Sequence, residues 1–327
     1  MAGPENLPAL HVPARDLPIP HSVSPAARAI MAMRRPPMPG YPALDDKSAW
    51  RAYAAAINGY MLPLMRERGA YVAADTVQRD IEGVTVYEVR PQGLPAGQTG
   101  VVLDIHGGAF IVGGGECCRA EAIELAGALQ AVVWSVDYSA PPDHPYPAPL
   151  DDCLTVYRHM LRQYRAQDIV VAGASAGANL AAALVLRARD EGLPLPGGAV
   201  LNTPGTDLTN SGDSHAANNG LDAVLSGDVD AIGLLYAGGH DLTDPYVSPQ
   251  FGDFTKGFCP SFLSAGTRDR LLSNAVRLHA ALRAADVPAD LYIIEAASHG
   301  GFHGAPEEAA LNREVRRFVH ARFGSAA

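Results

Sequence analysis

The pentapeptide Gly173-Ala174-Ser175-Ala176-Gly177 constrains the fold most, because it places a serine on a glycine-flanked turn between two regular elements. Residues 168–172 before it form an apolar run that predicts a buried strand, and residues 178–187 after it have the composition of a helix. A strand–turn–helix unit of this kind holds the serine hydroxyl at the edge of a sheet. Ser175 is therefore a candidate nucleophile. Glycine-rich turns also serve as plain connections in α/β proteins, so the rest of the chain must decide between these interpretations.

Strand and helix patterns alternate through the middle and the end of the chain. Strands are predicted at 100–106, 132–137, 168–172, 198–202, 260–266 and 289–295, after a hairpin formed by 76–79 and 84–90. Helices are predicted at 116–129, 146–164, 175–191, 272–285 and 306–322. This alternation is typical of the α/β class, with a mainly parallel sheet and right-handed crossovers.

Two segments depart from that alternation. Residues 1–45 are rich in proline, so they should be mostly extended with a short helix near 25–34, and residues 45–68 have the pattern of an amphipathic helix. Residues 204–239 contain many polar turn residues followed by a helix-like stretch at 226–236. An insertion after a strand usually lies at the carboxyl edge of the sheet, where ligands bind. The N-terminal helix could either pack on the main domain or form part of a lid.

Composition excludes several classes of function. A chain of 327 residues with 48% hydrophobic and 18% charged residues can form one large α/β domain with an elaboration. Its formal net charge of −10 argues against general binding to nucleic acid. The four cysteines form no CxxC pair, which favours reduced structural thiols in a cytoplasmic protein. The N-terminus shows no signal-peptide pattern, and no stretch is apolar enough for a membrane span.

An acid and a base follow the last two predicted strands. Asp269 lies just after residues 260–266, and His299 lies just after residues 289–295. The order serine, aspartate, histidine is the order of an α/β-hydrolase catalytic triad. In such a triad a neutral histidine accepts the serine proton, while the aspartate fixes the histidine tautomer and stabilises the imidazolium. We therefore predict that Ser175, Asp269 and His299 act together, with activity rising through an apparent pKa near ~6.5.

A glycine-rich stretch, His106-Gly107-Gly108-Ala109, ends the strand predicted at 100–106. Residues with little side chain let backbone N–H groups approach a developing oxyanion. A loop of this composition could instead hold a phosphate, but the chain lacks the G-x-x-x-x-G-K-[ST] and G-x-G-x-x-G fingerprints at this place. An oxyanion hole is the better interpretation.

Taken together, these motifs resemble those of the bacterial hormone-sensitive-lipase-like (family IV) esterases of the α/β-hydrolase superfamily. Residues 137–148, with the sequence DYSAPPDHPYPA, and residues 244–249, DPYVSP, are also similar to that family. The resemblance implies an eight-stranded, mainly parallel sheet flanked by helices, with a helical cap, and hydrolysis through an acyl-enzyme without metal or organic cofactor. It further implies that the amides of Gly108, Ala109 and Ala176 form the oxyanion hole, with Gly107 shaping the loop.

The resemblance also implies a division of the chain. The N-terminal cap segment would be 1–70, the catalytic core 71–203 and 241–327, and the cap insertion 204–240. A homodimer through the edge strand 289–295 is expected by analogy. The chain departs from the family at Ala174, where an aspartate or threonine is common, and at Ser139 and Ala140, where arginine and leucine are usual. His303 is a second histidine near the expected base, but the family pattern favours His299.

These expectations lead to a serine carboxylesterase that hydrolyses short- to medium-chain acyl esters. A lactonase, amidase, deacetylase or peptidase would use the same residues, because acyl-transfer chemistry is shared and selectivity depends on pocket shape. A non-catalytic small-ligand receptor on the same fold is a further alternative, which the complete triad disfavours. Candidate pocket or cap residues are Tyr41, Trp50, Tyr53, Phe110, Tyr138, Leu208 and Tyr236.

Overall fold

A computed structural model describes residues 9–33, 40–95, 97–227 and 229–323, and its centre is a single mainly parallel sheet. The strand order is β1-β2-β4-β3-β5-β6-β7-β8; β2 pairs antiparallel with both β1 and β4, and all other pairs are parallel. The strands are β1 (Ala74–Ile81), β2 (Val84–Pro91), β3 (Val101–Ile105), β4 (Val132–Asp137), β5 (Ile169–Ala174), β6 (Gly198–Asn202), β7 (Ser261–Gly266) and β8 (Ala289–Ile294). The predicted eight-stranded sheet is confirmed.

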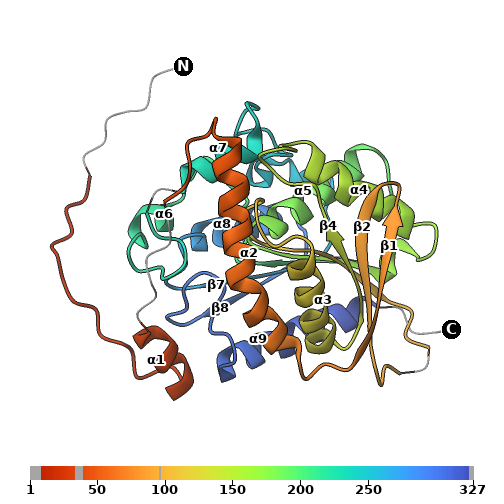
Figure 1. Cartoon of the computed structure of the whole chain (residues 1–327), viewed down its shortest axis with the longest axis horizontal. Coiled ribbons are helices and arrows are strands. Elements are labelled where there is room, and N and C mark those ends of the chain that lie inside the picture. The colour runs from red at the N-terminus through yellow and green to blue at the C-terminus, as the bar shows by residue number, and fades with distance from the viewer. Residues whose placement is uncertain (1–8, 34–39, 96, 228, 324–327) are drawn as a thin grey trace.

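Helices cover both faces of this sheet (Figure 1). The α-helices are α1 (Pro25–Ala32), α2 (Lys47–Gly69), α3 (Glu116–Leu129), α4 (Ala148–Met160), α5 (Ala176–Asp190), α6 (Asp213–Ala217), α7 (Asp230–Ala237), α8 (Leu272–Ala284) and α9 (Pro306–Arg322), and short 3₁₀ helices span Ala166–Asp168, Pro249–Phe251 and Phe254–Lys256. The predicted helix at 146–164 is shorter in the structure at both ends. Within the described residues, none of the helices combines the length and apolar composition that a membrane span requires.

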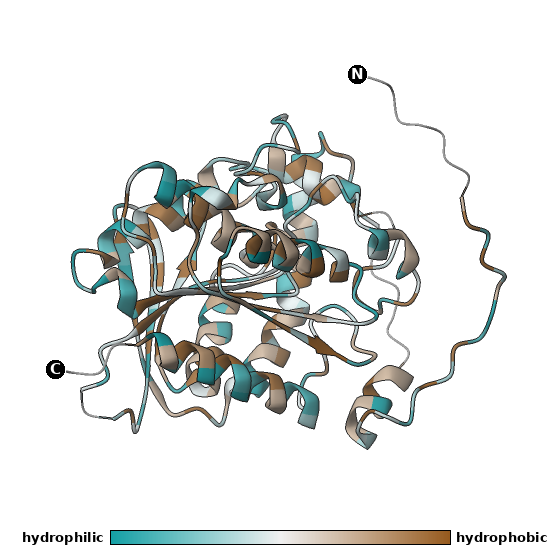
Figure 2. Cartoon of the chain, turned by 180° about the vertical axis from the view of Figure 1, so that it is seen from behind, coloured by the Kyte–Doolittle hydropathy of each residue, from teal (hydrophilic) through white to brown (hydrophobic). Residues whose placement is uncertain are grey.

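The two faces follow from the alternation of side chains along each strand. Leu103 of β3 belongs to a core cluster with Leu154 of α4 and Leu184 of α5, and Val101 belongs to the same cluster. Val102 lies between them in the strand and faces the other side of the sheet. On that other side, Val102 clusters with Ala126 of α3 and with residues of α9. Figure 2 shows the sheet nearly edge-on between the two helical layers, with hydrophobic residues along the strands. This arrangement fixes the carboxyl ends of β3, β5, β7 and β8 at one edge.

The helices of the N-terminal segment pack on the helical layer of the core, α2 against α3 and α1 against α9. Residues 9–17 are extended and exposed and lie away from the body of the molecule (Figure 1), whereas the carbonyl oxygen of Pro18 accepts a hydrogen bond from the guanidinium of Arg268, 3.4 Å away. Helix α2 begins after Asp46, whose carboxylate accepts a hydrogen bond from the amide of Ala49, and it packs along α3. The side-chain oxygen of Asn58 on α2 accepts a hydrogen bond from the amide of Gly113, 2.8 Å away. This contact joins α2 to the loop that follows β3.

The insertion between β6 and β7 contains more helix than expected. The helix-like stretch predicted at 226–236 is α7, which begins later, at Asp230. The short helix α6 was not predicted, because its five residues, DSHAA, are too few to show a periodic apolar face. It packs against α8. The predicted N-terminal cap segment and cap insertion include residues 1–8, 34–39 and 228, which lie outside the described residues.

All four cysteines are free and buried. Cys117 and Cys118 lie on α3, Cys153 lies on α4, and Cys259 lies just before β7. Burial raises the pKa of each thiol, because a thiolate is poorly stabilised away from water. These properties fit the predicted role of the cysteines as packing residues.

Candidate active site

The serine turn between β5 and α5 has the geometry that its glycines allow. Ser175 has φ +56° and ψ −117°, a strained conformation for a residue with a side chain. A Cβ on Gly173 would lie 2.4 Å from the backbone of Gly177, and a Cβ on Gly177 would lie 1.9 Å from the carbonyl oxygen of Ile105. Both positions therefore require glycine. Ser175 precedes the first residue of α5 without capping the helix with its side chain, so its hydroxyl remains available for other contacts.

The structure brings the three predicted catalytic side chains into contact. The Nε2 atom of His299 lies 2.9 Å from Oγ of Ser175. The Nδ1 atom of His299 lies 3.2 and 3.3 Å from the two carboxylate oxygens of Asp269. Asp269 is completely buried, and its carboxylate also accepts a hydrogen bond from the amide of Leu271. His303 instead pairs with Glu308, so the histidine at Ser175 is the one that the sequence favoured.

The environment of His299 changes its protonation. Burial lowers its pKa, but the charge of Asp269, the hydrogen bond to Asp269 and the charge of Asp222 outweigh this effect. The net result is a pKa above the ordinary value of 6.5. A histidine with a raised pKa is a stronger base once it has lost its proton, and its protonated form is stabilised after it takes a proton from a hydroxyl.

The loop after β3 adopts a left-handed backbone over three successive residues. The φ angles are +108° at Gly108, +56° at Ala109 and +62° at Phe110. The carbonyl of Gly108 accepts hydrogen bonds from the amides of Ile111 and Val112, which closes the loop on itself. Among the described hydrogen bonds, none pairs the amides of Gly108, Ala109 or Ala176 with a protein acceptor. These three N–H groups remain candidates for the predicted oxyanion hole.

A small pocket of about 70 Å³ adjoins Ser175 on the side of the insertion. Its lining is mostly apolar: Ala109, Phe110, Ser175, Ala176, Gly205, Asp207, Leu208, Asn210, Leu225, Val229, Ile232, Gly233 and Leu271. Phe110 and Leu208, two of the residues expected at a pocket, do line it. Trp50, Tyr138 and Tyr236, which were also candidates for the pocket or the cap, are not in this lining; they are buried in the main core cluster, Trp50 on α2 and Tyr236 on α7.

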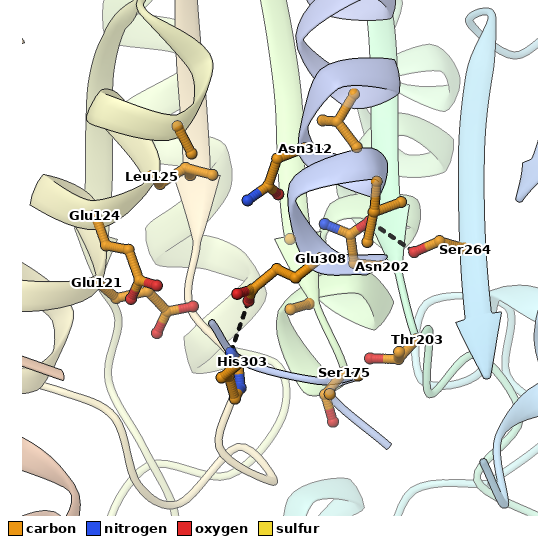
Figure 3. A pocket seen from close by; sticks show the side chains of 18 of the residues that line it. Glu121, Glu124, Leu125, Ser175, Asn202, Thr203, Ser264, His303, Glu308 and Asn312 are labelled. Carbon is orange, nitrogen blue, oxygen red and sulfur yellow. Dashed lines mark hydrogen bonds and ion pairs between the residues drawn. The ribbon is translucent and has the colours of Figure 1, made fainter. Parts of the chain in front are cut away.

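A larger cavity of about 340 Å³ lies behind the serine turn, between the sheet and helices α3 and α9. Ala174, the residue at which the sequence was expected to depart from the family pattern, lines this cavity and is partly exposed. Figure 3 shows Glu121, Glu124, His303 and Glu308 at its far end, while the hydroxyl of Ser175 points away from these acids. Burial raises the pKa of Glu121 to about 8. The lining of this cavity also includes Ser175, His299, Gly107 and Gly108, so the larger cavity and the small pocket both adjoin the serine.

Two groups of described residues place three potential metal ligands close together: His106, Cys118 and Asp137, and also Glu124, His303 and Glu308. Members of both groups already bond within the protein. Cys118 contacts Ser135, Asp137 accepts from the amide of Gly115, and Glu308 accepts from the amide of Gly304. The short distances between these ligand atoms are the only observation that suggests a cation site.

One buried acid at the site was not found from the sequence. Asp222 belongs to the insertion, is 2% exposed, and accepts hydrogen bonds from the backbone amides of Arg270 and His299. The sequence around it, NNGLDAVLS, contains no motif and follows a run of polar turn residues. Only the folded chain reveals its contact with the loops that carry the acid and the base.

Comparisons with known proteins agree with this fold and geometry. A family model described as alpha/beta hydrolase fold matches residues 102–303. An esterase of Acinetobacter venetianus is 36% identical over 210 residues, which cover 63% of this chain and 68% of that protein. Esterase LipI of Mycobacterium tuberculosis is 34% identical over 65% of this chain and 70% of its own length.

Solved structures extend the likeness over nearly the whole chain. The crystal structure of esterase E25 superposes with a TM-score of 0.89 at 37% identity and covers 97% of this chain and 99% of its own. The hormone-sensitive-lipase homologue EstE7, from a metagenome library, superposes with a TM-score of 0.76 at 28% identity, over 86% of this chain and 98% of its own.

Proposed function

Because the chain belongs to the hormone-sensitive-lipase-like esterases of the α/β-hydrolase fold and is a carboxylic ester hydrolase, we propose that it cleaves short- to medium-chain acyl esters through an acyl-enzyme on Ser175. The observation that carries this proposal is the continuous contact from Ser175 Oγ through His299 to Asp269. A serine paired with a buried, carboxylate-bound histidine is the arrangement that nucleophilic acyl transfer requires.

The proposed reaction follows from this geometry. Neutral His299 takes the proton from Ser175 Oγ as the oxygen attacks the ester carbonyl carbon. The carbonyl oxygen becomes an oxyanion, which accepts hydrogen bonds from the amides of Gly108, Ala109 and Ala176. Collapse of this intermediate breaks the bond to the alcohol oxygen, which receives the proton from His299. Water then repeats the sequence on the acyl-enzyme and releases the carboxylic acid.

We assign the acyl group to the small pocket beside Ser175. Its lining includes Leu208 and Ile232 from the insertion, Phe110 and Ala109 from the loop after β3, and Ala176 next to Ser175. A volume of about 70 Å³ corresponds to roughly two to three groups of ~30 Å³, the volume of a water molecule in the liquid. Acetyl to butyryl chains fit within it, whereas an octanoyl chain extends beyond it.

We therefore expect turnover of 4-nitrophenyl butyrate to exceed that of the octanoate ester by roughly tenfold or more in kcat/KM, because an octanoyl chain is too long for the pocket and must displace its walls, which costs about 1–3 kcal/mol; about 1.4 kcal/mol corresponds to tenfold. Purified protein assayed with the acetate, butyrate and octanoate esters gives the comparison. Amide and lactone substrates belong in the same series, since an amidase or lactonase would use the same three residues. Equal turnover of all three acyl lengths would contradict the assignment of the pocket.

A second expectation concerns pH. The pKa of His299 lies above 6.5, so the base is protonated and inactive over a wider acidic range than an unperturbed histidine would be. The acidic limb of kcat/KM should therefore have its midpoint above pH 6.5, higher than the sequence alone suggested, with a plateau on the alkaline side. A pH series with 4-nitrophenyl butyrate measures it, corrected for spontaneous hydrolysis. A midpoint below pH 6 would show that the carboxylates do not act on this imidazole as described.

We propose that the N-terminal segment 1–70 and the insertion 204–240 act as a cap on the core segments 71–203 and 241–327. In support, α2 contacts the loop after β3 through Asn58, and α7 supplies Ile232 to the acyl pocket. The homodimer through residues 289–295 stays a prediction; β8 is the edge strand of the sheet, and Ile293 is 39% exposed there. The cytoplasmic location also stays a prediction.

A non-catalytic receptor is the alternative from another class. It would keep the pocket but would not activate the serine, so a fluorophosphonate would leave Ser175 unlabelled. The contact between Ser175 and His299 favours the enzyme.

A further inference from the structure

Asp222 lies between the two loops that carry the proposed acid and base. One carboxylate oxygen, Oδ2, accepts a hydrogen bond from the amide of Arg270, 2.9 Å away, and Arg270 directly follows Asp269 in the chain. The amide of His299 lies 3.3 and 3.4 Å from the two oxygens of the same carboxylate. Asp222 thus binds the backbone on both sides of the contact between the acid and the base.

A local role accounts for only part of these contacts. Oδ1 of Asp222 also accepts hydrogen bonds from the amides of Val224 and Leu225, as a residue that stabilises a turn does. The bonds to the loops of Arg270 and His299 join residues 48 and 77 positions away in the sequence. They are not needed to form the turn.

Neutral side chains of the same insertion hold the same loop. The side-chain amide of Asn218 donates to the carbonyl oxygens of Asp269, at 2.8 Å, and Thr267. The hydroxyl of Ser214 donates to the carbonyl oxygen of Arg270, at 2.8 Å. These residues position the loop without a charge, so they provide a matched comparison for Asp222.

The charge of Asp222 faces His299 together with that of Asp269. The nearby guanidinium of Arg270 does not neutralise either acid directly, because it donates to the carbonyl oxygens of His215 and Gly227. Both carboxylates are almost completely buried, so their fields are weakly screened by solvent. The imidazole therefore has two buried negative charges beside it.

We propose that Asp222 is a positioning residue for the proposed ester hydrolysis: it fixes the Asp269 and His299 loops relative to each other, and its charge stabilises the protonated form of His299. The inference rests on the proposed function of the triad. It also makes the insertion part of the catalytic framework, because the carboxylate that joins the two loops comes from that segment.

The test compares Asp222→Asn with Asn218→Ala. The first change retains the size of the side chain and one of its two acceptor oxygens but removes the charge, so we expect the acidic limb of kcat/KM to move down by about half a pH unit to one unit. We also expect kcat to fall about tenfold with KM changed less than twofold, because the contact acts in the transition state. Asn218→Ala disturbs the same loop without changing charge, so its kcat should fall while its acidic limb stays at the wild-type pH.

NMR titration of the His299 imidazole, assigned with His299→Gln, separates this inference from the proposed function. It needs no ester turnover. A lower pKa for His299 in Asp222→Asn than in wild type supports the inference even if the esters tested are not substrates. An unchanged pKa, or an equal shift in Asn218→Ala, overturns it even if the protein is an active esterase.

Discussion

Replacement of Ser175 by alanine is expected to lower kcat for 4-nitrophenyl butyrate by at least about 10⁴-fold, because the acyl-enzyme cannot form without the hydroxyl. The fold should survive. The amide of Ser175 donates to the carbonyl of Asn202, and its own carbonyl accepts from the amide of Gly205, and both bonds belong to the backbone. Alanine therefore keeps the strained turn in place while it removes the nucleophile.

Ser264→Ala is the matched control for this change. Ser264 is a buried serine of β7 whose hydroxyl donates to the side chain of Asn202, and it lines the cavity behind the turn rather than the acyl pocket. Its loss should reduce kcat less than tenfold. Labelling with a fluorophosphonate, read by intact mass, should mark wild type and Ser264→Ala but not Ser175→Ala. Retention of full turnover by Ser175→Ala would refute the proposed mechanism.

Replacement of Gly108 by alanine should lower kcat/KM by about 10²- to 10³-fold, the usual effect of losing one oxyanion-hole donor. The φ angle of Gly108 is +108°, and a Cβ there would lie 2.2 Å from the carbonyl oxygen of Val112. The loop must therefore move, and its amides can no longer point at an oxyanion beside Ser175. The melting temperature should change little, because the strand and helices that support the loop are unchanged. The variant should therefore lose activity without losing its fold.

Gly93→Ala separates this effect from simple backbone strain. Gly93 also has a positive φ, +80°, but a Cβ there would meet nothing within 4 Å. We expect Gly93→Ala to cost ~1 kcal/mol of stability, the order of strain at such a position, and to leave kcat/KM unchanged. Circular dichroism melts and steady-state kinetics of both variants test the contrast. If Gly108→Ala kept kcat/KM within threefold of wild type, the loop would not supply the oxyanion donors.

The sequence was sufficient where local pattern and position in the chain carry the information. The apolar run of β3 and the glycines around Ser175 require a buried strand and a tight turn, and both are present. Asp269 and His299 were predicted because each follows a strand, and parallel strands bring their carboxyl ends to one edge. Ala174 was identified as a departure from related sequences, and the structure shows the cavity that it lines.

Sequence reasoning was weakest in the insertion. Helix α6 is too short to display a period, and α7 begins four residues after the predicted start. Asp222 was not identified from the sequence, because its partners are 48 and 77 residues away. Contacts over such distances depend on how the insertion folds over the sheet. The raised pKa of His299 was missed for the same reason, since one of its causes is that distant carboxylate.

The four buried cysteines can be used to detect local opening of the fold, because each thiol is protected from solvent while its surroundings stay packed. A thiol reagent can reach Cys117 and Cys118 only when α3 separates from its surroundings, and it can reach Cys153 only when α4 does so on the opposite face of the sheet. The rates at which the separate thiols react therefore report the opening of each layer independently. A variant that loses activity while all four thiols stay protected is impaired in catalysis, whereas a variant with exposed thiols is unfolded.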